Sequence, residues 1–133
     1  MALQFSTSIR NAILDQIEST IGTSAVLKIR EGAAPANVAA ADTGTVLATL
    51  SLPSDWMAAA SSGSKALAGT WQDASADATG TAAHFRIYAS DGTTAHIQGT
   101  VGTSGADLIV DSTSFTATQS FTISTFTLTA PGA

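Results

Sequence analysis

The spacing of apolar residues changes at Gly22, and this change constrains the fold more than any other feature of the sequence. Before Gly22 the apolar residues recur mainly every four positions, which is typical of an amphipathic helix with one face on a core. This set comprises Ile9, Ile13, Ile17 and Ile21, with Leu14 beside them. We predict a helix over residues 6–22. Ser6 or Ser8 would cap its start, and Gly22 would end it, because glycine readily adopts the conformation that follows a helix.

After Gly22 apolar and polar residues alternate, as in half-buried β-strands. Strands are predicted over residues 25–30, 45–52, 65–71, 82–101 (as a hairpin), 107–111 and 119–129. Residues 54–64 fit either a helical turn or an exposed loop. The alternation slips by one residue between Ile123 and Phe126, which predicts a bulge or a crossover between sheets. About seven or eight short strands separated by turns favour a β-sandwich or a barrel.

The hairpin over residues 82–101 carries the clearest local signal. Asp91-Gly92 is a strong turn dipeptide between its two alternating arms. A loop of three residues, 90–92, would pair Phe85 with Ile97 and keep the apolar side chains of both arms on one face. We therefore predict that loop, with Gly92 in a left-handed conformation.

Composition limits both the class of protein and its partners. Ala, Thr and Ser make up 62 of the 133 residues, so the apolar core is thin and a monomer would gain stability from neighbours. The absence of cysteine excludes disulfides and thiolate zinc sites. A net charge of −5 disfavours nucleic acid, whose phosphates need a basic surface. With no signal peptide and no apolar run of about 20 residues, we expect a soluble single domain over residues 1–133 that is made in the cytoplasm.

Polar side chains gather on one face of the hairpin: His84, Arg86, Tyr88 and His96. A histidine there could act as a general base, but no nucleophile motif accompanies it, and two histidines are too few for zinc. A solvated or interface-facing strand surface is the favoured interpretation. The aspartates (Asp73, Asp77, Asp91, Asp107 and Asp111) match no calcium loop and are interpreted as turn residues. We predict no enzyme activity, no cofactor and no metal.

Three groups of segments resemble small virion structural proteins of tailed bacteriophages, namely the capsid cement (decoration) proteins. They are Met1-Ala2-Leu3-Gln4-Phe5-Ser6 with Arg10-Asn11-Ala12; Ala25-Val26-Leu27-Lys28-Ile29 with Pro35-Ala36-Asn37 and Thr43-Gly44-Thr45-Val46-Leu47-Ala48; and Thr79-Gly80-Thr81-Ala82 with Phe85-Arg86-Ile87-Tyr88 and Ser90-Asp91-Gly92-Thr93. The resemblance covers nearly the whole chain and carries no catalytic signature. One departure is Ala117-Thr118-Gln119, where a glycine turn would be expected before the last strand.

The resemblance implies a jelly-roll-like antiparallel β-sandwich with one N-terminal helix, bound to the outer surface of an icosahedral head. Its partner would be the major capsid protein, whose capsomers it would bridge, with no binding to nucleic acid or membrane. For the protein's own assembly a homodimer is favoured, because closed two-fold assemblies are the commonest, and a trimer is the rival. Two other functions stay open: a tail or baseplate component, and a carbohydrate-binding β-sandwich that uses Trp56 or Trp71 as a stacking platform.

Six residues are candidate contacts with the capsid or with another copy of the chain. Leu3 and Phe5 lie in the N-terminal arm, residues 1–5, which precedes the capped helix. Trp56 and Met57 follow Pro53 in a segment predicted to be exposed, and aromatic residues often anchor interfaces. Replacing Trp56 with alanine is therefore expected to weaken particle binding more than folding. A third, weaker choice comprises Arg86 and Tyr88.

Overall fold

A computed structural model describes residues 2–133, so Met1 of the predicted arm lies outside the described residues. The predicted helix is confirmed: α1 spans Thr7–Ile21. Its boundaries follow from two capping residues. The Ser6 hydroxyl accepts a hydrogen bond from the backbone N–H of Ile9 at 3.3 Å, and Gly22, with φ of 97°, donates its N–H to the carbonyl of Glu18.

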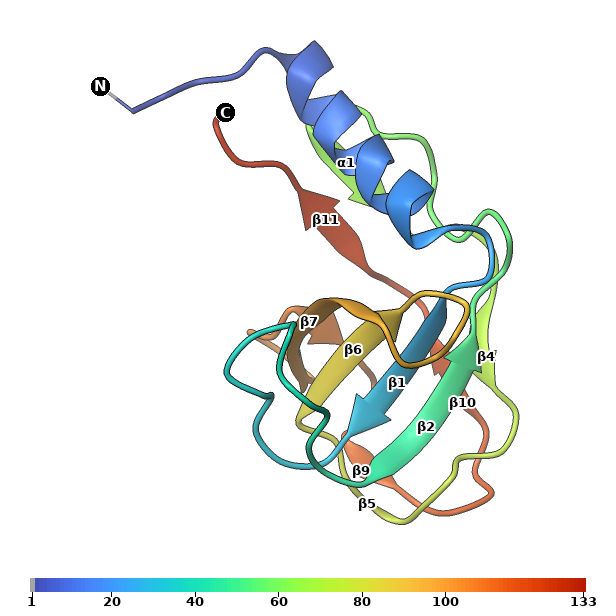
Figure 1. The fold of residues 1–133 in the computed structure, drawn as a ribbon. Coiled ribbons are helices and arrows are strands. Elements are labelled where there is room, and N and C mark those ends of the chain that lie inside the picture. The colour runs from blue at the N-terminus through green and yellow to red at the C-terminus, as the bar shows by residue number, and fades with distance from the viewer. Residues whose placement is uncertain (1) are drawn as a thin grey trace.

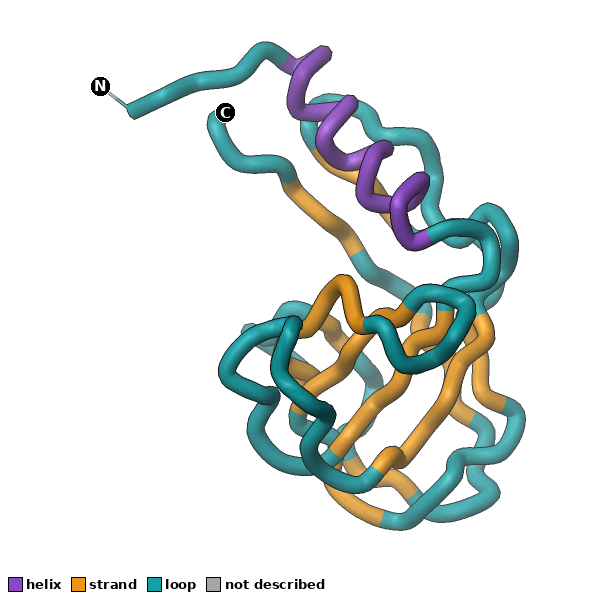
Figure 2. Tube along the Cα trace, in the orientation of Figure 1, coloured by secondary structure: helices purple, strands orange, loops and turns teal. Residues whose placement is uncertain are grey.

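All the other regular elements are β-strands, as predicted, and they are joined by loops (Figure 2). Within residues 2–133 the strands are β1 (Val26–Arg30), β2 (Val46–Ser51), β3 (Ser64–Ala66), β4 (Trp71–Asp73), β5 (Gly80–Thr81), β6 (His84–Tyr88), β7 (Ala95–Gly102), β8 (Leu108–Ile109), β9 (Ser114–Phe115), β10 (Phe121–Ile123) and β11 (Thr127–Thr129). They outnumber the seven or eight predicted because the segments predicted over 65–71 and 119–129 are each divided into two strands, and because β5 and β9 lie outside the predicted ranges. The slip before Phe126 is a crossover: β10 pairs with β4, whereas β11 pairs with β3.

One layer of the fold is a five-stranded sheet in the order β2-β1-β6-β7-β8. Its pairs are antiparallel except β7–β8, which is parallel. The remaining strands form three antiparallel pairs, β5–β9, β4–β10 and β3–β11. These pairs are nested around the β6–β7 hairpin, as in a long double-stranded ribbon that has folded over. Figure 1 shows much of this ribbon behind the five-stranded sheet, an arrangement compatible with the predicted β-sandwich.

The core lies between these layers and is built by alternation along the strands. Leu27 of β1 and Phe85 and Ile87 of β6 are buried on the inner face of the sheet. Phe126 packs edge-on against Phe85, with ring centroids 5.7 Å apart, and tilts against Trp71 at 5.5 Å. Aromatic side chains therefore supply much of the apolar area that the small-residue composition lacks.

The β6–β7 hairpin differs from its predicted register. Phe85 lies opposite Gly99 and Ile87 opposite Ile97, a shift of two residues that keeps the same side chains on each face. The loop spans residues 90–93, because the N–H of Ala89 bonds to the carbonyl of Thr94 at 3.0 Å. Gly92 has the predicted left-handed conformation, with φ of 67°. A bulge between Ile87 and Tyr88 in the pairing takes up the extra residue.

The helix packs on β3 and, with β11, stands out from the sandwich (Figure 1). Leu14 and Ile21 are buried beneath it, but Ile9 is 50% exposed and Ile13 is 38% exposed. The prediction that the whole isoleucine stripe faces the core is therefore wrong. The helix rotates its Leu14 side inward instead, because Lys65 of β3 lies there and binds acidic side chains of α1.

Candidate functional site

The polar face of the hairpin is covered by the loop of residues 31–45 and does not face solvent. Arg86 is 2% exposed, Tyr88 is fully buried and His84 is 1% exposed. The interpretation of this face as a solvated or interface-facing surface is thus wrong for these three residues. Arg86 and Tyr88 are corrected from candidate contacts to internal residues, because the loop between β1 and β2 folds back over the sheet.

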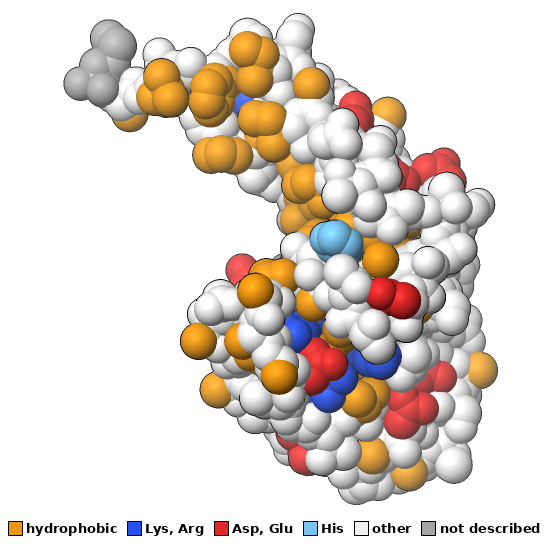
Figure 3. Space-filling model, in the orientation of Figure 1, with side chains coloured by type: hydrophobic (Ala, Val, Ile, Leu, Met, Phe, Trp, Pro, Cys, Tyr) orange, Lys and Arg blue, Asp and Glu red, His pale blue; other side chains and the backbone are white. Residues whose placement is uncertain are grey.

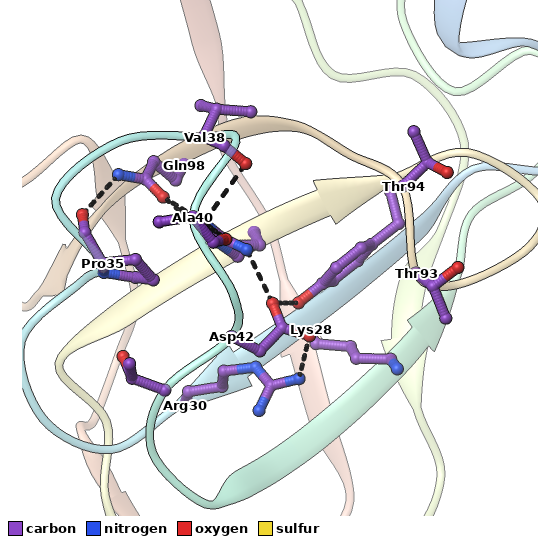
Figure 4. Close-up of polar contacts among 12 residues, drawn as sticks. Lys28, Arg30, Pro35, Val38, Ala40, Asp42, Thr93, Thr94 and Gln98 are labelled. Carbon is purple, nitrogen blue, oxygen red and sulfur yellow. Dashed lines mark hydrogen bonds and ion pairs between the residues drawn. The ribbon is translucent and has the colours of Figure 1, made fainter.

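Asp42 of this loop is the centre of the network (Figure 4). Its Oδ1 accepts hydrogen bonds from Arg86 Nη1 and from the Tyr88 hydroxyl, both at 2.7 Å. Its Oδ2 accepts one from Arg30 Nη2 at 3.0 Å. A single carboxylate therefore binds side chains from β1 and β6 and ties the loop to both strands.

The electrostatics of the network stabilise an ionised Asp42. Partial burial acts to raise its pKa, but the hydrogen bonds from Tyr88 and Arg86 and the charges of the two arginines outweigh it, so the pKa of Asp42 lies below its usual value. Burial, and next its hydrogen bond to Asp42, raise the pKa of the Tyr88 phenol. The phenol therefore stays protonated and donates to the carboxylate at neutral pH.

Arg86 also binds the loop backbone. Its Nη2 donates to three carbonyl oxygens, those of Asn37 at 3.0 Å, Val38 at 3.3 Å and Ala40 at 3.0 Å. Both Nε and Nη2 donate to the side-chain oxygen of Gln98, whose Nε2 in turn donates to the carbonyl of Pro35 at 2.9 Å. A buried guanidinium is costly unless paired and hydrogen-bonded. Here its donors hold the loop, so this arrangement is structural.

The two histidines are not brought together. His84 lies opposite Thr100 in the hairpin, and its Nδ1 is 2.7 Å from the carbonyl of Gly32, which requires the tautomer protonated at Nδ1. Its Nε2 is buried without a hydrogen-bond partner. His96 lies near the other end of the hairpin and is exposed. Among residues 2–133, no cluster of three or more His, Cys, Asp or Glu side chains is placed to hold a metal ion.

Trp56 and Met57 are core residues, which corrects their assignment as exposed contacts. Trp56 is fully buried and Met57 is 1% exposed. The Trp56 indole donates to the carbonyl of Gly22 at 3.0 Å, so the segment after Pro53 passes beneath the C-terminal end of α1. Trp71 is also fully buried and donates to the carbonyl of Trp56 at 3.1 Å. Neither indole is available to stack on a sugar, which removes the proposed carbohydrate platform.

Asp91 is a turn residue, as interpreted, whereas Asp73 also links two strands. Asp91 accepts hydrogen bonds from the N–H groups of Thr93 and Thr94 in the hairpin loop. These bonds, with that from the Thr94 hydroxyl the strongest influence, hold the pKa of Asp91 well below its usual value. Asp73 accepts from the N–H groups of Thr49 and Ser75. Its carboxylate therefore links β4 to β2.

The N-terminal arm lies beside the C-terminal tail. The N–H of Phe5 donates to the carbonyl of Gly132 at 2.7 Å, and the Phe5 ring packs so closely on Gly132 that a Cβ there would lie 2.6 Å from it. Phe5 is partly buried by this contact, whereas Leu3 is 77% exposed. Of the six candidate contact residues, Leu3 is thus the most accessible.

The exposed apolar surface that sequence reasoning missed is on α1. We define the apolar face of α1 as Ile9, Ile13, Gln16, Ile17 and Thr20. Beside it runs a groove of about 240 Å³, the α1–β7 groove, lined by Ile13, Gln16, Ile17, Thr20, Ile21, His96 and Ile97. The repeat of isoleucines predicted a buried stripe, and nothing in the local sequence shows that β3 covers the neighbouring face instead.

None of the protein-family models, curated proteins or solved structures compared with this chain matches it. Within residues 2–133, no helix has both the length and the apolar character needed to cross a membrane.

Proposed function

We propose that the protein is a structural component of a tailed-phage virion that binds the outside of the head and stabilises contacts between capsomers of the major capsid protein. The observation that carries a docking role is the 77% exposure of Leu3, a large apolar side chain on a chain poor in them. The choice of the phage head as the partner rests on the resemblance of its three groups of segments to cement proteins.

The use made of the polar side chains also supports a docking role. Arg86 and Tyr88 are the residues that chemistry or ligand binding would need on the hairpin, and their polar atoms bind Asp42 and the loop backbone instead. This use of the polar side chains supports a protein whose exposed apolar residues contact a partner. Contacts of this kind are individually weak, and repetition over a shell raises their combined affinity.

The N-terminal arm is the part of the molecule best placed to reach the shell. Phe5 fixes the base of the arm to the C-terminal tail, and Leu3, which precedes that contact, is 77% exposed. Figure 1 shows the arm extending away from the start of α1. Because Phe5 already anchors the arm, less chain entropy is lost when Leu3 docks. We therefore assign the shell contact to Leu3 and give Phe5 an anchoring role.

The test is to add purified protein to heads that lack it and to count bound copies by quantitative gel and electron cryomicroscopy. We expect hundreds of copies per head, and we expect Leu3→Asp to reduce occupancy at least about tenfold, since about 1.4 kcal/mol of lost contact has that effect. Ala33→Asp, on an exposed alanine of the loop of residues 31–45, is the matched control. Absence from purified virions, or a handful of copies confined to the tail, would overturn the proposal.

A further inference from the structure

The apolar face of α1 lacks a partner within the described part of the chain. Ile9 and Ile13 are exposed to 50% and 38%, and Ile17 is half-buried. Figure 3 shows apolar side chains gathered over the helix above a hollow between α1 and the sandwich. The α1–β7 groove lies there, and a second hollow lined in part by Leu128 of β11 shares Ile97 with it. Helix, β7 and β11 thus form one concave surface.

This face carries no acidic side chain. Asp15 and Glu18 lie on the other side of α1 and pair with Lys65 of β3. Arg10 lies at the edge of the face, beside Ile13 and Ile17 along the helix, and its guanidinium donates to the carbonyl of Ala130. The α1–β7 groove is lined by isoleucine, glutamine, threonine and His96, with no acidic or permanently basic side chain. The second hollow is lined in part by Asp107, so the absence of acidic side chains applies to the helix face and the α1–β7 groove, on a chain whose net charge is −5.

We propose that the apolar face of α1 is the interface of a homodimer in which the occupant is a second copy of this chain. A two-fold interface places the same surface against itself. On an acidic protein most choices of surface would bring like charges together, and this face would not. Its residues Ile9, Ile13 and Ile17 form a ridge spaced by four, and two such ridges would interdigitate, each in the groove beside the other, at about −50°.

An interface of the size that a stable dimer needs must include residues outside the helix. A stable interface buries about 800 Å² on each partner, which a few isoleucines alone do not supply. The concave surface extends the contact to Ile97 and Leu128, and the groove of about 240 Å³ offers room for side chains of the partner's helix. The proposal deepens the proposed function, since it rests on that function for the expectation of an oligomer and assigns the surface.

Charge placed on the face tests the proposal. We expect sedimentation to show a dimer of the full chain, and Ile13→Glu to raise its dissociation constant at least about tenfold. Ser8→Glu puts the same charge on an exposed position of α1 away from the face and is expected to leave the dimer intact. Ile9→Glu repeats the test should Ile13→Glu not fold by circular dichroism. A chain that stays monomeric at about 100 µM, or a dimer indifferent to both changes on the face, would overturn the proposal.

Crosslinking gives an independent readout because the chain has no cysteine. Under mild oxidation Ile13→Cys is expected to form a disulfide-linked dimer faster than Ser8→Cys, and equal rates count against the interface.

Measuring the binding of these variants to heads distinguishes this proposal from the proposed function. A monomer that still decorates heads overturns the dimer interface alone, and a dimer that fails to bind them overturns the function alone. If Ile13→Glu abolishes head binding of a monomeric protein, the face is a shell contact and the proposal is wrong.

Discussion

Asp42 attaches a loop to the sheet, a role that buried apolar side chains have elsewhere in the molecule. The loop of residues 31–45 is rich in alanine and offers few large side chains to bury. Its attachment to the sheet therefore depends on hydrogen bonds, above all those that Asp42 accepts from Arg30, Arg86 and Tyr88. Such bonds to a charged group are worth about 1.5–3 kcal/mol each in stability, and removal of the acceptor leaves buried donors without a partner.

Asp42→Asn is expected to lower the free energy of unfolding by about 2 kcal/mol and to increase hydrogen exchange in the loop. The pKa of Asp42 is lower in the folded chain than its ordinary value of 3.8. Its stabilising effect is thus fully present above about pH 4 and is lost as pH falls through the folded pKa. Urea titrations from pH 7 to 2 should show a smaller acid loss for the variant. The control is Asp111→Asn, at an exposed position; an equal effect there would contradict this role.

Trp56 is a second residue with a structural role, which follows from its burial. Trp56→Ala is expected to cost about 3–5 kcal/mol in stability, because the indole is fully buried and bonds to Gly22 at the end of α1. Trp56→Phe keeps most of the apolar volume and loses the hydrogen bond, so a cost nearer 1–2 kcal/mol is expected. Thermal and urea unfolding of the isolated chain measure both. Full stability with lost particle binding would restore Trp56 as a surface contact.

At the scale of elements, ion pairs determine which of two possible faces of α1 packs on the rest of the molecule. Its isoleucines would bury more apolar area than the face that contacts β3. That face is instead fixed by Lys65, 2% exposed, which binds Asp15 at 2.7 Å and Glu18 at 2.8 Å. Leu14, next to Asp15 in the helix, is buried on this side of α1. Ile9 and Ile13 are therefore left exposed.

A matched pair of truncations measures which face of α1 is packed. Leu14→Ala is expected to destabilise the chain by about 2–5 kcal/mol, as for other buried leucines. Ile13→Ala, at the adjacent and partly exposed position, should cost less than about 1 kcal/mol. Urea unfolding is to be measured at low protein concentration, so that any dimer has dissociated. Comparable losses for the two variants would show that the isoleucine side is buried in the monomer.

The sequence predicted elements more accurately than their contacts. The ends of α1 follow from Ser6 and Gly22, which act through bonds to residues three or four positions away. The alternation in the hairpin was likewise correct, but a loop one residue longer than predicted and the one-residue bulge near His96 together moved its register by two residues. The burial of Trp56 and Arg86 escaped prediction because it depends on segments tens of residues away in the chain. Only the folded chain brings Gly22 or Asp42 to them.

At the scale of the whole molecule, the strand pairs are nested, and each pair farther from the central hairpin joins strands that are farther apart in the sequence. The β6–β7 hairpin closes over a loop of residues 90–93, whereas the pairs β5–β9, β4–β10 and β3–β11 join segments successively farther apart. Closing a longer loop costs more chain entropy. Each inner pair brings the strands of the next pair closer and shortens the loop that remains. The ribbon is therefore expected to form outward from the hairpin.

Folding kinetics of two matched variants test this order. Ile87→Val in β6 and Ile123→Val in β10 remove the same methylene from side chains that are both almost fully buried, and each should cost about 0.5–1.5 kcal/mol. If the hairpin forms first, Ile87→Val slows folding, whereas Ile123→Val mainly speeds unfolding. Stopped-flow refolding and unfolding in urea measure both rates, with refolding expected in milliseconds to seconds for pairings this distant in sequence. Equal slowing of folding by the two substitutions would mean that β10 pairs with β4 already in the transition state, and that the ribbon does not grow outward from the hairpin.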